Sequence, residues 1–199
     1  MDGMARSITT VYFVRRAEPN YNNHDDRLRE LSEKGMEDRK RVSAYLADKG
    51  INVILSSPYK RAVDMVSHFA ESRKLPVRVV EDFRERKVDS GWIEDFDGFC
   101  KRQWADFSYC LTDGETLAQV QSRNLAALAE VLREYAGKNI VIGSHGAALS
   151  TVIHFYDPSF GYEDFQAIKS LMPWVVKFSF EGDRLLRMEK IDLFSQDRS

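Results

Sequence analysis

Residues 9–22 read Thr-Thr-Val-Tyr-Phe-Val-Arg-Arg-Ala-Glu-Pro-Asn-Tyr-Asn, and the rest of the chain is best understood from them. The β-branched and aromatic run from Val11 to Val14 is typical of a buried strand, and Pro19 prevents that strand from continuing. Arg15 and Arg16 therefore lie where the strand ends. In α/β proteins ligands bind at this end of parallel strands, so two adjacent guanidinium groups predict an anionic partner. Taken alone, the pair also fits an ordinary solvated surface.

The segments that follow alternate between strand-like and helix-like patterns. Ser32 is suited to be the N-cap of a helix that stops before Gly50, and Pro58 is suited to be the first residue of the next helix. The expected strands are 51–55, 77–80 and 140–143, and the further helices are 94–106, 115–135, 147–155 and 162–170. Two late runs, 174–180 and 184–191, have the pattern of a hairpin. This order predicts an α/β protein with three layers, in which helices flank a mostly parallel sheet.

Length and composition indicate one ordinary globular domain over residues 1–199. The net charge of -2 and the pI near 6.1 argue against a nucleic-acid-binding surface. Cys100 and Cys110 are too few for a disulfide framework, which favours reduced thiols in a cytoplasmic protein. The longest apolar run near the N-terminus is too short for a membrane segment. A metal-dependent hydrolase would need clustered His and carboxylate ligands, which the sequence does not offer, so no metal or cofactor is expected.

Polar residues follow each of the four predicted parallel strands. Arg15 and Arg16 follow the first, Arg61 lies just after the second, Glu85 follows the third, and His145 follows the fourth. The carboxyl ends of parallel strands share one edge of the sheet, so these side chains should converge. Guanidinium groups and helix N-termini both bind phosphate oxygens. The residues therefore predict a pocket for a small phosphate ester, which phosphate or sulfate would also occupy.

These segments resemble the histidine phosphatase superfamily, whose members have the phosphoglycerate-mutase-like fold. The matching motifs, in the order of the family, are Val-Arg-Arg-Ala-Glu (14–18), Leu-Ser-Glu-Lys-Gly (31–35), Ser-Ser-Pro-Tyr-Lys-Arg-Ala (56–62), Arg-Glu-Arg (84–86), Gly-Glu-Thr (114–116) and Gly-Ser-His-Gly (143–146). Each motif is weak by itself, whereas six in the same order are specific, and they cover most of the chain.

The resemblance assigns roles by position. It implies phosphate contacts from Arg15, Arg61, Asn22 and Gly146. It implies that Glu85 gives a proton to the leaving oxygen, which requires a carboxyl group held protonated near neutral pH by burial or neighbours. It also implies that His145 stabilises charge on the transferred phosphoryl group.

Arg16 occupies the position at which the family has a nucleophilic histidine. A guanidinium group stays protonated and has no lone pair for attack on phosphorus, so the phosphohistidine route is closed in this sequence. His145 is a poor substitute, because in-line displacement fixes the face of the phosphorus from which attack occurs. Arg16 then either adds a cation to the phosphate site or forms an ion pair with Glu85 that fills it.

Two functions stay open for such a chain. One is a phosphatase for a small phosphorylated molecule, impaired here because a single base change turns a histidine codon into an arginine codon. The other is a natural pseudoenzyme that binds phosphate esters in a regulatory role. A phosphoglycerate mutase is less favoured, because only the 59 residues from 86 to 144 separate Glu85 from His145. The segment 88–112 should cover the pocket, and its aromatic residues suggest a leaving group with a ring.

The remaining expectations concern the other histidines and assembly. His24 is expected in solvent, and His68 and His154 are expected to have structural roles. The edge strand of the late hairpin could pair with a second copy of the chain.

Overall fold

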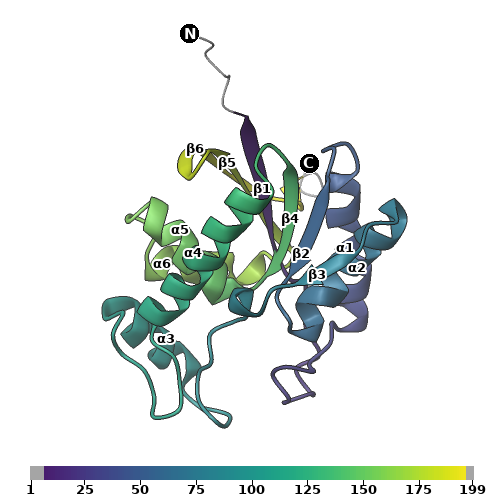
Figure 1. Cartoon of the computed structure of the whole chain (residues 1–199). Helices are drawn as coiled ribbons and strands as arrows, with labels where there is room; N and C mark the ends of the chain where they lie inside the picture. Colours follow the sequence, from purple (N-terminus) through teal and green to yellow (C-terminus); the bar gives the residue numbers. More distant parts are fainter. Residues whose placement is uncertain (1–6, 196–199) are drawn as a thin grey trace.

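The computed structural model describes residues 7–195, which form one six-stranded sheet with helices on both faces (Figure 1). The strands are β1 (Ile8–Arg15), β2 (Val53–Ser56), β3 (Val77–Val79), β4 (Asn139–Ser144), β5 (Trp174–Glu181) and β6 (Arg184–Ile191). The α-helices are α1 (Glu33–Leu46), α2 (Lys60–Arg73), α3 (Phe96–Ala105), α4 (Leu117–Glu134), α5 (Gly146–Tyr156) and α6 (Tyr162–Ala167). Two short 3-10 helices are η1 (Glu81–Phe83) and η2 (Ile168–Ser170).

The strand order is β3-β2-β4-β1-β5-β6. The first four strands in this order run parallel, whereas β5 and β6 are antiparallel to their neighbours. The expected mostly parallel sheet and the late hairpin are therefore confirmed. Because β1, β2 and β4 are adjacent and parallel, the residues that follow them meet at one edge of the sheet.

The three layers follow from the alternation of side chains along each strand. In β1, Val11 and Phe13 pack into a core with α4 and α5, while Tyr12 and Val14 pack on the other face with α1 and α2. A strand that is buried on both faces has a continuous apolar sequence, because successive side chains point to opposite sides. This is why the run from Val11 to Val14 identifies a central strand.

The helix starts test the local predictions. The Ser32 side chain accepts a hydrogen bond from the Gly35 N–H, so the predicted N-cap is confirmed. The prediction for Pro58 is wrong, because α2 begins two residues later at Lys60. The Ser57 hydroxyl accepts from the Tyr59 N–H at 3.2 Å, and the Lys60 N–H donates to the Arg27 carbonyl at 3.0 Å. The first of these bonds is local and the second is tertiary, and Tyr59 between them is extended, with φ -69° and ψ 132°.

Two other helices end three residues earlier than the sequence predicts. The first ends at Leu46, and Gly50 lies beyond it in a turn with a φ of 62°. The helix expected over 162–170 is divided into α6 and the 3-10 helix η2. The carbonyl groups at the end of this segment are used by the candidate site.

Candidate functional site

The candidate site lies where β1, β2 and β4 end. Arg15 is paired with Ser144 in the β1–β4 register, and Ser56 is paired with Gly143 in the β2–β4 register. The backbone continues this alignment, since the Arg16 N–H donates to the Ser144 carbonyl at 3.2 Å. Three segments far apart in the sequence are therefore held at the same level of the sheet.

Arg15 is buried and is anchored to the segment that follows α6. Its guanidinium group donates to the carbonyl oxygens of Ile168 and Leu171, the latter at 3.1 Å. Burial lowers the pKa of Arg15 to about 10, and the charge of Arg16 acts in the same direction. A Cβ atom on Gly146 would lie only 3.2 Å from the Nε and Nη2 atoms of Arg15. Glycine at this position thus allows the guanidinium group to lie against the start of α5.

Arg16 lies beside Arg15, and its neighbours include the phenol of Tyr21. Its Nη1 donates to the Ala17 carbonyl and lies 3.1 Å from the Met172 sulfur. Burial lowers the pKa of Arg16, and the charge of Arg61 lowers it further. Among the ion pairs of residues 7–195, none joins Arg16 to Glu85. The structure therefore does not contain the ion pair that was one of the two options for Arg16.

Arg61, at the start of α2, is buried and reaches the loop between β1 and α1. Its two terminal nitrogens donate to the backbone carbonyl and to the carboxylate of Asp26, the latter at 3.0 Å. Its Cζ also lies 5.0 Å from the centre of the Tyr59 ring. Asp26 is half exposed, so an anion that entered from solvent would compete with it for Arg61.

His145 is fully buried between β4 and α5. Its Nε2 lies 2.7 Å from the Ser57 hydroxyl, while its Nδ1 has no partner among the described residues. Burial lowers the pKa of His145 well below its ordinary value, and the charges of Arg61 and Arg16 act in the same direction. The imidazole is therefore neutral at pH 7, and the entry of an anion would offset the effect of the arginines.

Glu85 is half buried and occupies the N-terminus of α5. Its two carboxylate oxygens accept from the N–H groups of Ala147 at 3.1 Å and Ala148 at 2.9 Å. One oxygen also accepts from the Arg86 N–H at 2.8 Å. A negative group is favourable at a helix N-terminus, which explains why the carboxylate of Glu85 lies there.

Four buried nitrogens of this cluster lack a partner among the described residues. They are the Nε atoms of Arg15, Arg16 and Arg61 and the Nδ1 atom of His145. Buried polar groups are normally hydrogen-bonded, so several unpartnered donors at one place indicate a missing acceptor. Three guanidinium groups also repel each other unless an anion lies between them. The arrangement is therefore suited to bind a compact anion with several oxygens.

Asn22 is the predicted residue that the structure leaves outside this cluster. It is exposed, and its backbone N–H donates to the side chain of Asn20 at 3.1 Å. A phosphate contact from Asn22 stays a prediction.

Sequence reasoning missed the pair that holds Glu85 in place. Arg123, on α4, donates to the carbonyl oxygens of Asp82, Arg84 and Glu85 and forms an ion pair with Glu115 at 2.8 Å. Burial raises the pKa of Glu115, but the bonds from Arg123 and from a backbone N–H lower it overall. The Gly-Glu-Thr motif was a signal for Glu115, whereas nothing local distinguished Arg123 from a surface residue of its helix.

Replacing Arg123 by methionine is expected to destabilise the protein by about 3 kcal/mol, because Glu115 and three carbonyl groups lose a largely buried partner. Unfolding in urea measures the effect. Arg78 is a matched control, because its ion pair with Glu134 is half exposed, and Arg78→Met should cost about 1 kcal/mol or less. Equal costs for the two variants would show that Arg123 is not the support of the Glu85 segment.

The histidines outside the cluster behave differently from one another. His68 Nδ1 lies 2.7 Å from the Ser43 hydroxyl, and His154 Nδ1 lies 2.7 Å from the Phe160 carbonyl, which fits their expected structural roles. His24 is exposed, as expected, but its ring also stacks on Trp92. Sequence reasoning did not anticipate that contact, because it joins two loops.

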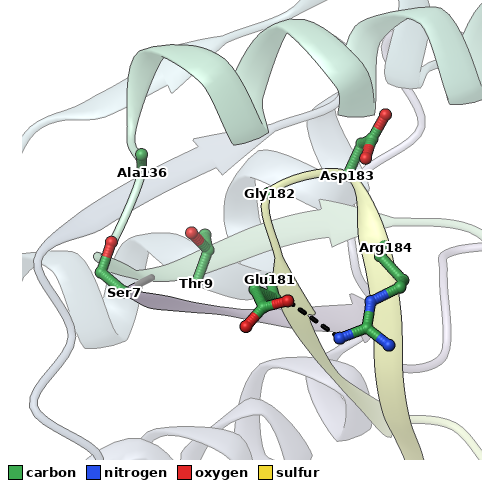
Figure 2. A pocket seen from close by; sticks show the side chains of 7 residues that line it. All are labelled: Ser7, Thr9, Ala136, Glu181, Gly182, Asp183 and Arg184. Carbon is green, nitrogen blue, oxygen red and sulfur yellow. Dashed lines mark hydrogen bonds and ion pairs between the residues drawn. The ribbon is translucent and has the colours of Figure 1, made fainter. Parts of the chain in front are cut away.

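A hollow of about 430 Å³ lies at the opposite end of the sheet, where β1 begins. Figure 2 shows Ser7, Thr9 and Ala136 on one side of it and the β5–β6 turn on the other, where Glu181 and Arg184 form an ion pair. The opening contains none of the predicted site residues. Its one cation, Arg184, is paired with Glu181, and its third charged side chain is the acid Asp183, so the hollow lacks the unpaired cations of the candidate site.

The described residues set limits on other chemistry. In residues 7–195, no group of three His, Cys, Asp or Glu side chains is placed to hold a metal ion. Over the same range, no helix has the length and apolar character needed to cross a membrane.

The chain is similar in sequence to known phosphatases. A sequence model of the histidine phosphatase superfamily (branch 1) matches residues 11–186. A Bacillus subtilis (strain 168) protein named "Uncharacterized phosphatase PhoE" is 28% identical over 123 residues, which are 62% of this chain and 62% of that protein. The match therefore covers less than two thirds of the length of that relative.

Solved structures share the fold. The native mycobacterial glucosyl-3-phosphoglycerate phosphatase has a TM-score of 0.74 and 19% identity, and the match covers 92% of this chain and 97% of that one. The same phosphatase also matches in complexes with inorganic phosphate and with VO3. A phosphoserine phosphatase mutant from Entamoeba histolytica, with one histidine replaced by alanine and phosphoserine bound, has a TM-score of 0.74 and 19% identity, covering 93% and 98%. At these identities the likeness shows the fold alone.

Proposed function

Because the chain belongs to the histidine phosphatase superfamily, branch 1, we propose that its strand-edge cluster binds the phosphoryl group of a small phosphate monoester. The observation that carries this proposal is the set of unpartnered nitrogens on Arg15, Arg16, Arg61 and His145. A phosphoryl group supplies several oxygen acceptors and negative charge in the volume of one compact group.

Arg15 and Arg61 are the main phosphate ligands in this proposal. Arg15 is fixed by two carbonyl groups, so it presents its remaining N–H groups without a large loss of side-chain entropy. Arg61 exchanges the carboxylate of Asp26 for phosphoryl oxygens. Gly146 leaves room beside Arg15, and the neutral imidazole of His145 contributes one further donor or acceptor.

Arg16 has opposite effects on binding of the phosphate group and on its transfer. It adds positive charge that favours the bound anion, but it cannot form a covalent bond to phosphorus. The mutant phosphoserine phosphatase with one histidine replaced by alanine is a relative in fold that still holds phosphoserine. That precedent supports the view that substrate binding persists in this chain although turnover is impaired.

A second function applies if the original sequence has histidine at position 16 and a base change has replaced it by arginine. In that case the chain is a phosphatase of small phosphorylated molecules, and the form described is its impaired variant. This option is favoured over a pseudoenzyme that has long been free of selection for catalysis, because the chain keeps all of Arg15, Arg61, Glu85 and His145.

Calorimetric titration with inorganic phosphate tests the proposed binding. The protein with Arg16 should bind one phosphate, and Arg61→Met should weaken binding roughly tenfold or more, because a charge-assisted bidentate contact is lost. Arg187, an exposed residue of β6 that lies in an ion pair with Glu189, is a matched control for the loss of one positive charge. Arg187→Met should bind phosphate as the unchanged protein does.

The thermal melting temperature of each variant separates loss of binding from loss of folding. Absence of phosphate binding by the folded, unchanged protein would refute the proposed function. Equal affinities for the unchanged protein and the folded Arg61 variant would remove Arg61 from the site.

A further inference from the structure

Two loops meet beside the proposed phosphate site. The first, residues 19–31, connects β1 to α1, and the second, residues 84–95, connects η1 to α3. Figure 1 shows both loops at the end of the molecule toward which β1 runs. They touch through His24 and Trp92, whose rings are stacked with centres 4.7 Å apart and planes 16° apart.

Each loop is tied to the cationic cluster. In the first loop, Asp26 binds Arg61, and the phenol of Tyr21 lies next to Arg16, where it favours the guanidinium charge. The second loop begins with Glu85 and its neighbours. In the sequence, His24 lies two residues before Asp26, and Trp92 lies seven residues after Glu85. The stacked pair is therefore close along the chain to two residues at the site.

Exposed apolar side chains gather on these loops. Of the nine large hydrophobic residues exposed in the described chain, four belong to the two loops or to the first residue of α3. These four are Tyr21, Leu28, Trp92 and Phe96. Trp92 is the most exposed of the nine, at 67%, so an incoming ring can stack on its indole. Exposed apolar side chains on loops that contact a binding site are suited to receive the apolar part of a ligand.

The charges of the same loops disfavour a second anionic group. Asp25, Asp89, Glu94 and Asp95 take part in none of the ion pairs of residues 7–195. Arg27 and Arg29, by contrast, are paired with Glu81 and Asp26. Lys87 is the one exposed cation of the two loops that takes part in no ion pair of residues 7–195. A leaving group that carried a carboxylate would therefore meet four unpaired acids for one unpaired cation.

We propose that His24 and Trp92 form the leaving-group subsite of this protein, which selects phosphate monoesters whose alcohol bears a ring and no further negative charge. The inference rests on the phosphate-binding function proposed above. It assigns the phosphoryl group to the arginines and the ring to the stacked pair.

Titrations of the unchanged protein, in which residue 16 is arginine, test this subsite with three probes. Phenyl phosphate should bind roughly 5- to 10-fold more tightly than inorganic phosphate, because one aromatic stack is added. Phosphoglycolate, whose alcohol part carries a carboxylate and neither a ring nor an ammonium group, should gain nothing over inorganic phosphate. Trp92→Ala should remove this difference in affinity, so that phenyl phosphate and inorganic phosphate bind equally tightly. Phe155→Ala, a matched exposed aromatic on α5, should retain it.

The outcomes separate the two proposals. If inorganic phosphate binds but phenyl phosphate binds no more tightly, the subsite is refuted and the phosphate site stands. The subsite is also refuted if Trp92→Ala keeps the full difference in affinity or if phosphoglycolate gains as much as phenyl phosphate. If none of the three probes binds to the folded protein, both proposals fail together.

Discussion

Arg16→His should confer phosphatase activity at least on the order of 10³-fold above that of the unchanged protein. A neutral imidazole at the end of β1 supplies the lone pair that arginine lacks. We expect its nitrogen to form the bond to phosphorus as the ester P–O bond breaks, with Glu85 as the proposed donor of a proton to the leaving oxygen. Water then cleaves the P–N bond and releases phosphate. Release of p-nitrophenol from p-nitrophenyl phosphate measures the rate, and an acid-labile phosphoprotein identifies the intermediate.

Arg16→Ala is the control for this experiment. It removes the guanidinium group without supplying a nucleophile, so the variant should remain inactive while still binding phosphate. If Arg16→His folds and binds phosphate but has no more activity than Arg16→Ala, the pseudoenzyme is favoured over the impaired phosphatase.

In the Arg16→His background, Glu85→Gln should lower kcat about 10²- to 10⁴-fold for phenyl phosphate and far less for p-nitrophenyl phosphate. A glutamine keeps the shape and can still accept from one of the two N–H groups at the start of α5, but it cannot transfer a proton to the leaving oxygen. Phenol is the poorer leaving group, so it depends more on that proton. Comparison of kcat for the two esters measures the role of Glu85.

Glu81→Gln is the matched control, because Glu81 forms a half-exposed ion pair with Arg27 and lies four residues earlier in the chain. It should change neither rate by more than a small factor. An equal loss for both esters in Glu85→Gln would show that Glu85 acts by holding α5 and not as the acid.

Local patterns predicted the elements well because each pattern reports on a few neighbouring residues. The run from Val11 to Val14 gave a strand buried on both faces, and Ser32 gave a helix N-cap. The prediction for Pro58 was wrong because Tyr59 is extended and α2 begins at Lys60, whose N–H donates to Arg27, thirty-three residues earlier in the chain. Local preferences do not contain that information.

The same distinction applies to the site. Arg15, Arg61, Glu85 and His145 could be placed at one edge because parallel strands bring their carboxyl ends together. The contact of Asp26 with Arg61 was not predictable, because it depends on how an irregular loop folds back on the sheet. The support that Arg123 gives to Glu85 was hidden for the same reason, since it spans thirty-eight residues.

The amino-acid sequence by itself determined the layered α/β architecture, the residues at the strand ends and the absence of a nucleophilic lone pair at position 16. These depend on side-chain periodicity, on chain direction and on the chemistry of arginine. Only the tertiary structure decided that Glu85 caps α5 instead of pairing with Arg16, and that His24 stacks on Trp92. Those contacts join segments whose spacing is fixed by packing of the whole fold, and no stretch of sequence encodes that packing locally.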